Sequence, residues 1–216
     1  MKKRIGLLAS LLIAMLLISA CSLMEPFDAS GYVRAVLDAS TKGEFDAYIE
    51  FTDSSKEQAQ KMYNNILNRE VKALELDDVS DELLTKFREL FVEIYQLTRY
   101  EVLEAEQGEE KTFTVDVRIE PLMIFENLHE EITTAIEEYI QEIFRNATAG
   151  EGVPTDEEVR EGAAQRVYEV LAVRLANPVY GERQTLTVVV ARDDDNVYGI
   201  SEADYKKLLN MIFGLE

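Results

Sequence analysis

The sequence predicts an α+β fold with N-terminal helices packed on a curved antiparallel meander sheet of about four strands and a long helical pair inserted between strands. Apolar residues recur at helical spacing through the first half of the chain. The period then shortens to two over residues 112–120, which is typical of a half-buried strand. Helical spacing returns over residues 124–176, ahead of a β-branched segment at 185–191.

Three helical segments are expected before the sheet. Asp28 is placed to cap the first, and Gly43 ends it before a further turn or two. Ser54 and Glu57 have the spacing of a capping box that starts the second segment, and Ser80 caps the third. The apolar stripes of the last two are Ala59, Met62, Tyr63, Ile66, Leu67, Val71 and Leu74, and then Leu83, Leu84, Phe87, Leu90, Phe91, Ile94 and Leu97.

Strict alternation identifies the best-defined strand. Its apolar positions are Phe113, Val115, Val117 and Ile119, and Pro121 ends it. Residues 100–107 are expected to pair with it across a turn at 108–110, and their poorer alternation indicates a bulge.

The inserted helical pair is expected between residues 122 and 177. Its first helix begins near Ile124, a loop with two glycines follows at 147–153, and Thr155 with Glu158 forms a capping box for the second helix. Residues 185–191 are apolar on both faces, which predicts a central strand. Residues 193–196 turn this strand into a short one at 197–200, and Ser201 caps a closing helix.

The N-terminus has the order of a bacterial lipoprotein signal. Three cations at positions 2–4 precede an apolar run at 5–18 that is too short for a permanent transmembrane helix. Ile18, Ser19, Ala20 and Cys21 resemble the lipobox, so residues 1–20 are expected to be a lipoprotein signal peptide. The resemblance implies that Cys21 carries diacylglycerol, with fatty chains such as palmitate, and anchors the protein to the extracytoplasmic face of the cell membrane. The alternative is a chance cysteine after an ordinary signal peptide.

The charge of the chain excludes several partners. The net charge is −20, and it becomes −23 once the three cations at positions 2–4 are removed with the signal. Such a surface repels phosphate backbones and anionic headgroups, so no nucleic-acid partner is expected. The lipid alone must then keep the protein on the membrane. Because Cys21 is the only cysteine, the exported domain has no thiol for a disulfide or a nucleophile.

Four segments resemble a family of uncharacterised bacterial surface lipoproteins with a nuclear transport factor 2-like or cystatin-like domain. They are residues 27–33, 42–45, 112–121 and 195–209. The resemblance implies one α+β domain over residues 28–216, with 122–177 as a helical insertion and 21–27 as the lipidated cysteine and a short tether. Both enzymes and binding modules occur on this fold.

Few residues suggest catalysis. His129 begins HEEIT, where Thr133 replaces the second histidine of a zinc-protease motif. Residues 193–196 are interpreted as a charged turn and not as a calcium loop, because a calcium loop would need glycine at position 198, where this sequence has Tyr198. We expect no catalytic residue, no metal site and no cofactor. The candidate residues of a ligand cleft are Tyr32, Tyr63, Tyr95 and Tyr139, for which core packing is the competing explanation.

The sequence therefore predicts a membrane-anchored lipoprotein that binds an unknown small molecule or protein through the concave face of its sheet and is not an enzyme. The alternative is a hydrolase or acid–base enzyme built on carboxylates of the same fold. A purely structural envelope protein is a third possibility.

Overall fold

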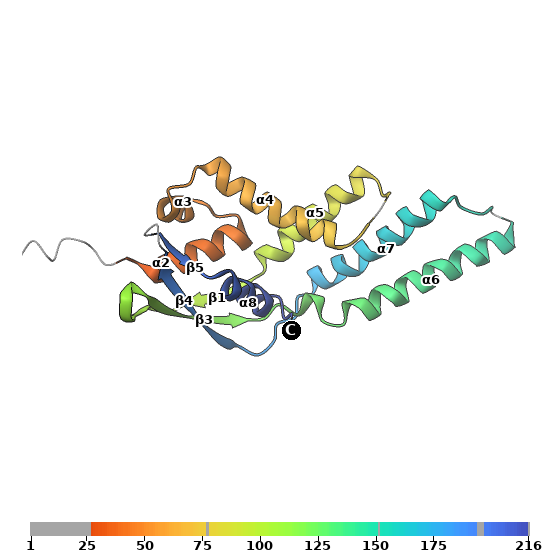
Figure 1. Ribbon diagram of the computed structural model, residues 1–216. Coiled ribbons are helices and arrows are strands. Elements are labelled where there is room, and N and C mark those ends of the chain that lie inside the picture. Colours follow the sequence, from red (N-terminus) through yellow and green to blue (C-terminus); the bar gives the residue numbers. More distant parts are fainter. Residues whose placement is uncertain (1–26, 77, 151, 194–196, 216) are drawn as a thin grey trace, which may run out of the picture.

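Helices precede, interrupt and follow one antiparallel sheet in the computed structural model (Figure 1). The structure describes residues 27–215 except 77, 151 and 194–196. The α-helices are α2 (Ala29–Leu37), α3 (Asp46–Thr52), α4 (Lys56–Ala73), α5 (Asp81–Gln96), α6 (Leu128–Ala149), α7 (Asp156–Ala176) and α8 (Glu202–Ile212). Shorter helical turns are the π-helix η2 (Asp38–Lys42) and the 3-10 turns η3 (Glu109–Lys111) and η4 (Met123–Phe125). The strands are β1 (Arg99–Val102), β2 (Glu106–Gln107), β3 (Phe113–Glu120), β4 (Gln184–Arg192) and β5 (Tyr198–Ile200). This is the predicted α+β architecture.

The strands form a meander in the order β1-β3-β4-β5, with β2 also paired to β3. Residues of β3 alternate between buried and accessible positions, which confirms the predicted period of two. Val102 pairs with Val117, whereas Glu106 pairs with Thr114. Between these pairs, three residues (103–105) face two (115–116), so the predicted bulge lies between β1 and β2.

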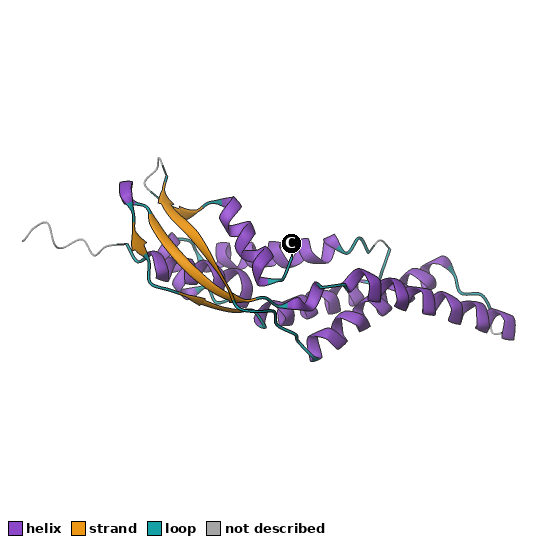
Figure 2. Ribbon diagram, turned by 90° about the horizontal axis from the view of Figure 1, so that it is seen from below, coloured by secondary structure: helices purple, strands orange, loops and turns teal. Residues whose placement is uncertain are grey.

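The sheet is twisted, and one of its faces is covered by helices (Figure 2). Helices α2 and α8 pack directly on β3 and its neighbours, and α4 and α5 pack behind them around η2. Val115, Val117, Val188 and Val190 are fully buried beneath this cover. The concave face, which we expected to be an open binding surface, is instead the floor of the hydrophobic core.

The other face of the sheet carries charge. Glu120 lies between Arg183 and Arg99, with N–O distances of 2.6 and 3.4 Å, and Arg118 lies 3.4 Å from Glu101. Side chains of β4 on this face are accessible, including Val189 at 41% exposure. Strand β4 lies between β3 and β5, which confirms the predicted central strand, although helices pack on one side of the sheet alone.

Most helix starts lie where the sequence predicts them. Asp28 accepts a hydrogen bond from the Gly31 amide at 2.8 Å, and Gly43 ends η2 with a left-handed φ of 70°. The capping box of α4 is formed by Ser55 and Gln58, one residue later than predicted. Ser80 caps α5 as expected.

Helices α6 and α7 form an antiparallel pair that extends away from the sheet in both views (Figures 1 and 2). We call this pair the arm. Its first helix begins at Leu128, after η4, and not at Ile124, and it continues to Ala149 through the first part of the predicted loop. The capping box of Thr155 and Glu158 is present.

The two ends of the arm meet at the sheet. Leu122 forms a β-bridge with Tyr180, the Met123 amide donates to the Val179 carbonyl, and the Gly181 amide donates to the Pro121 carbonyl. The pairing of β3 with β4 therefore continues to the point where the arm leaves, so the inserted helices do not interrupt the ladder.

Candidate functional site

The four tyrosines predicted to line a ligand cleft lie in separate places. Tyr32 belongs to an aromatic cluster in which Phe27 stacks on Tyr198 with ring centroids 4.0 Å apart. Phe27 therefore packs on the domain, although the sequence placed it in the tether. Tyr95 is buried against Phe213, at a centroid distance of 4.6 Å.

Tyr63 and Tyr139 also have packing roles. Tyr63 is buried edge-on to Phe45, and its hydroxyl has no hydrogen-bond partner among the described residues. Tyr139 extends from α6 across Gly162 and donates to the Glu158 carbonyl at 3.2 Å. A Cβ atom at position 162 would collide with this ring, so the glycine permits the two helices of the arm to approach. The structure does not bring the four tyrosines together.

The other predicted positions give no reactive group. His129 is exposed in the first turn of α6, and its carbonyl accepts a hydrogen bond from the Thr133 hydroxyl. Asp193 accepts from the Val197 amide at 2.8 Å, as a charged turn should. Within the described ranges, no three His, Cys, Asp or Glu side chains converge as metal ligands. Cys21 and residues 194–196 lie outside the described residues.

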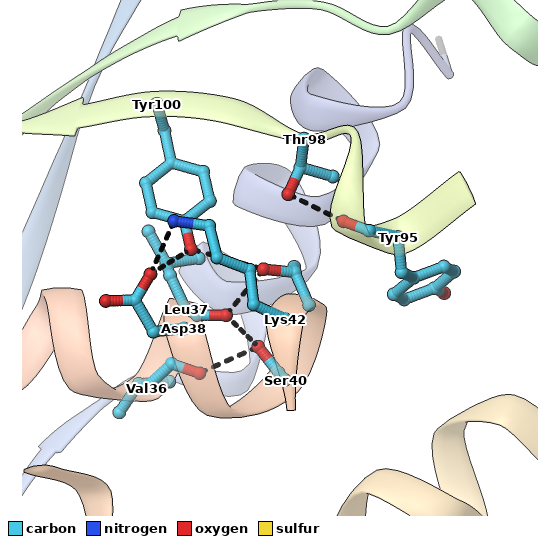
Figure 3. Close-up of polar contacts among 9 residues, drawn as sticks. Val36, Leu37, Asp38, Ser40, Lys42, Tyr95, Thr98 and Tyr100 are labelled. Atoms are coloured by element: carbon cyan, nitrogen blue, oxygen red, sulfur yellow. Dashed lines mark hydrogen bonds and ion pairs between the residues drawn. The ribbon is translucent and has the colours of Figure 1, made fainter. Parts of the chain in front are cut away.

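A polar cluster joins η2 to β1 (Figure 3). The Tyr100 hydroxyl donates to Asp38 at 2.5 Å, and Lys42 lies 2.8 Å from the same carboxylate and 4.4 Å from the Tyr100 ring centroid. Ser40 and Thr41 donate to the carbonyls of Val36 and Leu37, which the wider turn of a π-helix leaves without their α-helical partners.

This cluster is the strongest place to look for the alternative acid–base chemistry, but its groups are already matched. Burial and the Asp38 carboxylate both raise the pKa of Tyr100. The phenol therefore stays protonated and donates a hydrogen bond to Asp38. Lys42 neutralises Asp38 across one helical turn. The arrangement holds the π-helix against the edge strand and leaves no free base beside a cavity.

An open pocket lies where the sheet, the base of the arm and α8 meet. Its volume is about 650 Å³, within the range of ligand pockets. Apolar walls come from Met123, Leu186 and Met211, and the rim carries Glu182, Lys207 and Asn210.

The concave face of the sheet contributes to this pocket at one point. Leu186 pairs with Val117 and shares its face, but the helical cover stops short of it and leaves it partly exposed. The opposite wall depends on Gly214, which has a φ of 60°, and a Cβ atom there would lie 2.8 Å from the Met123 sulfur.

The pocket is lined by few charged side chains. Of the side chains that line it, only Glu182 and Lys207 carry a charge, and Lys207 is 3.2 Å from Asp204 outside the pocket. An apolar group could enter against the methionines while the rim hydrogen-bonds to its polar end. Sequence periodicity did not identify this site, because its walls come from three segments far apart in the chain.

The arm exposes apolar side chains that other helices bury. Ile140 and Phe144 of α6 are 43% and 68% exposed, and no residue of α6 is buried. By contrast, α7 buries Ala164, Val167 and Leu171.

No protein-family model and no curated protein matches the sequence. Among solved structures, the chain is similar to that of a candidate lipoprotein, ycdA, from Bacillus subtilis subsp. subtilis strain 168, with a TM-score of 0.59 and 12% sequence identity. The match covers 87% of this chain and 56% of that chain, so this chain spans about half the length of the Bacillus protein. The similarity shows a shared fold, which is that of a candidate bacterial lipoprotein. No helix in the described ranges has the length and apolarity to cross a bilayer.

Proposed function

We propose that the protein is a bacterial lipoprotein, anchored through Cys21 to the extracytoplasmic face of the membrane, whose domain is a binding module and not an enzyme. The lipobox-like residues 18–21 support the anchor, and the fold shared with a candidate lipoprotein agrees with it. In Figure 1 the arm extends from the side of the molecule opposite to the start of α2. An anchor that precedes α2 would leave the arm pointing away from the membrane.

We also propose that the domain has a nuclear transport factor 2-like or cystatin-like fold. Helices before an antiparallel meander, with a closing helix after it, support this proposal. The arm is the departure, because it inserts two long helices between β3 and β4.

The observation that carries the binding function is the pocket between β4, η4 and α8. Its apolar walls and polar rim favour a ligand with an apolar group and a hydrogen-bonding end, such as a peptide side chain or a small amphipathic molecule. Carboxylate catalysis needs two acidic groups or an acid with a matched base beside the substrate. Here Glu182 is the one carboxylate that lines the pocket.

Binding is tested by measuring thermal stabilisation of the full chain by a panel of hydrophobic peptides and small amphiphiles. Gln184→Trp places an indole over the pocket and should abolish the shift caused by any hit. Gln107→Trp makes the same change at an exposed position of β2 and should leave it intact. A hit that survives Gln184→Trp unchanged would place binding elsewhere.

The enzyme alternative is tested with glycosidase, peptidase and esterase substrates. We expect no turnover. Any activity should be re-measured in His129→Ala, Asp38→Asn and Glu182→Gln variants that keep the wild-type melting temperature. Activity abolished by one of the two carboxylate changes would replace the binding module with the enzyme.

The anchor is tested by Cys21→Ser. The variant should lose acylation and should no longer sediment with membranes. Continued acylation with unchanged membrane fractionation would rule out Cys21 as the lipid site.

A further inference from the structure

The outer side of α6 combines exposed apolar side chains with unpaired acidic ones. Ile136, Ile140 and Phe144 follow at intervals of four, so they lie on one side of the helix. Only the first of them packs against the main core. Towards the tip, α6 therefore leaves an apolar strip that α7 does not cover.

Carboxylates run beside this strip. Glu130, Glu137 and Phe144 are spaced by seven residues and so follow one line along α6, and Glu137 precedes Ile140 by three. Both glutamates are exposed, and neither forms an ion pair with any described residue, whereas Glu131 and Glu142 bind Arg174 and Arg166 of α7. The third arginine of α7, Arg160, lies 3.7 Å from Asp78, outside the arm. The cations of α7 are thus paired elsewhere, and the outer carboxylates are left for another molecule.

The charge of the arm decides between possible occupants. Residues 128–176 contain eleven Asp and Glu against four Arg, which leaves a net charge of −7. A second copy of the arm or an anionic membrane would place like charges together at this surface. The one arginine of α6, Arg145, is the residue after Phe144 and so points about 100° away from it around the helix.

We propose that this surface docks an amphipathic helix of a partner protein, with apolar residues for Ile140 and Phe144 and Lys or Arg for Glu130 and Glu137. Two long antiparallel helices provide a ridge against which a third helix can pack as in a bundle. The apolar strip supplies the contact area, and the acidic line fixes the side on which the cations of the partner lie. This inference is independent of the pocket and of the lipid anchor.

The experiment uses the full chain in detergent and a fluorescent probe peptide. The peptide is an amphipathic helix of about 18 residues made of Leu, Lys and Ala, with leucines at helical spacing. A second peptide has glutamates in place of the lysines. Binding is followed by fluorescence anisotropy at low and at physiological salt.

We expect the lysine peptide to bind and the glutamate peptide not to bind. The double variant Ile140→Ser/Phe144→Ser should weaken the affinity at least about tenfold, because two large apolar contacts are lost. Glu130→Gln/Glu137→Gln should weaken it by roughly threefold or more and reduce its salt dependence, since it removes two of the charges that attract the lysines.

The matched control is Val189→Ser/Val197→Ser, which makes two exposed valines polar outside the arm and should leave the affinity unchanged. Equal binding by all variants would show that the peptide follows the acidity of the whole protein, and that would overturn the proposal. So would no binding by the wild-type chain. Dimerisation of the wild-type chain that is lost in Ile140→Ser/Phe144→Ser would identify a second copy as the occupant and also overturn it. If Ile140→Ser/Phe144→Ser fails to fold, the affinity of Glu130→Gln/Glu137→Gln still tests the proposal.

Discussion

Strand β3 and helix α6 use their apolar residues in opposite ways. β3 has Phe113 at 6% exposure and Val115, Val117 and Ile119 at 0%, whereas α6 has 22 residues and none of them is buried. The body, which we define as the sheet with α2 to α5 and α8, contains most of the core. The arm is joined to it chiefly through the contact of α7 with α5. We infer that the body provides the stability of the fold and that the arm is free to interact.

The largest effect should come from the middle of β3. Val117→Asp buries a carboxylate that has no partner among its apolar neighbours, and it should cost roughly 4 kcal/mol or more of unfolding free energy. Asp116→Ala, one residue away on the charged face, removes an exposed hydrogen bond from Thr187 and should cost about 1 kcal/mol or less. Urea unfolding of both variants measures the difference, and equal costs would mean that the register of β3 is wrong.

The next effect compares the side of α7 that packs on the body with the side that is exposed. Leu171→Ala removes a fully buried side chain and should cost about 2–4 kcal/mol. Val173, two residues further on, is 65% exposed, and Val173→Ala should cost less than about 0.5 kcal/mol. The comparison is made by thermal unfolding. Similar losses for the two would show that α7 does not pack on α5 as described.

A smaller and more local effect is expected inside the arm. Gly162→Val would push the Tyr139 ring off α7 and should destabilise the arm by about 1–3 kcal/mol. Because the arm contributes little to the core, the unfolding midpoint of the body should hardly move. Amide exchange in α6 should become faster. A loss of body stability of the same size would mean that arm and body unfold as one unit.

The smallest effect concerns the hydrogen bonds between the N-cap of α5 and helix α7. The Ser80 amide and hydroxyl donate to Glu161 at 2.8 and 2.5 Å, and these bonds lower the pKa of Glu161. Their contribution to stability is present above the ordinary pKa of a glutamate and is lost as the pH falls through the lowered value. Ser80→Ala should therefore raise the pKa of Glu161 in an NMR titration. Thr85→Ala, in the same helix, is the control. An unchanged pKa in Ser80→Ala would show that this contact is absent in solution.

Local signals in the sequence predicted most of the body and the start of α7. The alternation of β3, the caps Asp28 and Ser80, and the box of Thr155 and Glu158 each depend on a few neighbouring residues. The box of α4 was displaced because Ser54 and Ser55 both have a suitable residue three positions later. In the structure the Ser54 hydroxyl is 2.8 Å from Thr52, which leaves Ser55 to cap the helix.

Long-range packing decided what the sequence could not predict. Residues 185–191 have the β-branched composition of a strand, but composition does not determine whether a helix covers the second face. The pocket requires Met123, Leu186 and Met211 to meet, and no spacing within any of their segments indicates this. The four predicted cleft tyrosines lie on or beside apolar stripes, and such stripes indicate packing positions and not ligand contacts.

Native-state hydrogen exchange tests the division between body and arm most directly. If the body holds the fold and the arm is held mainly by its own two helices, amides in α6 beyond Ile136 should exchange at least about 100-fold faster than those at the centre of β3. Protection should rise again in the half of α7 that contains Leu171. Equal protection of α6 and β3 would contradict the account, because the arm would then belong to the same cooperative unit as the core.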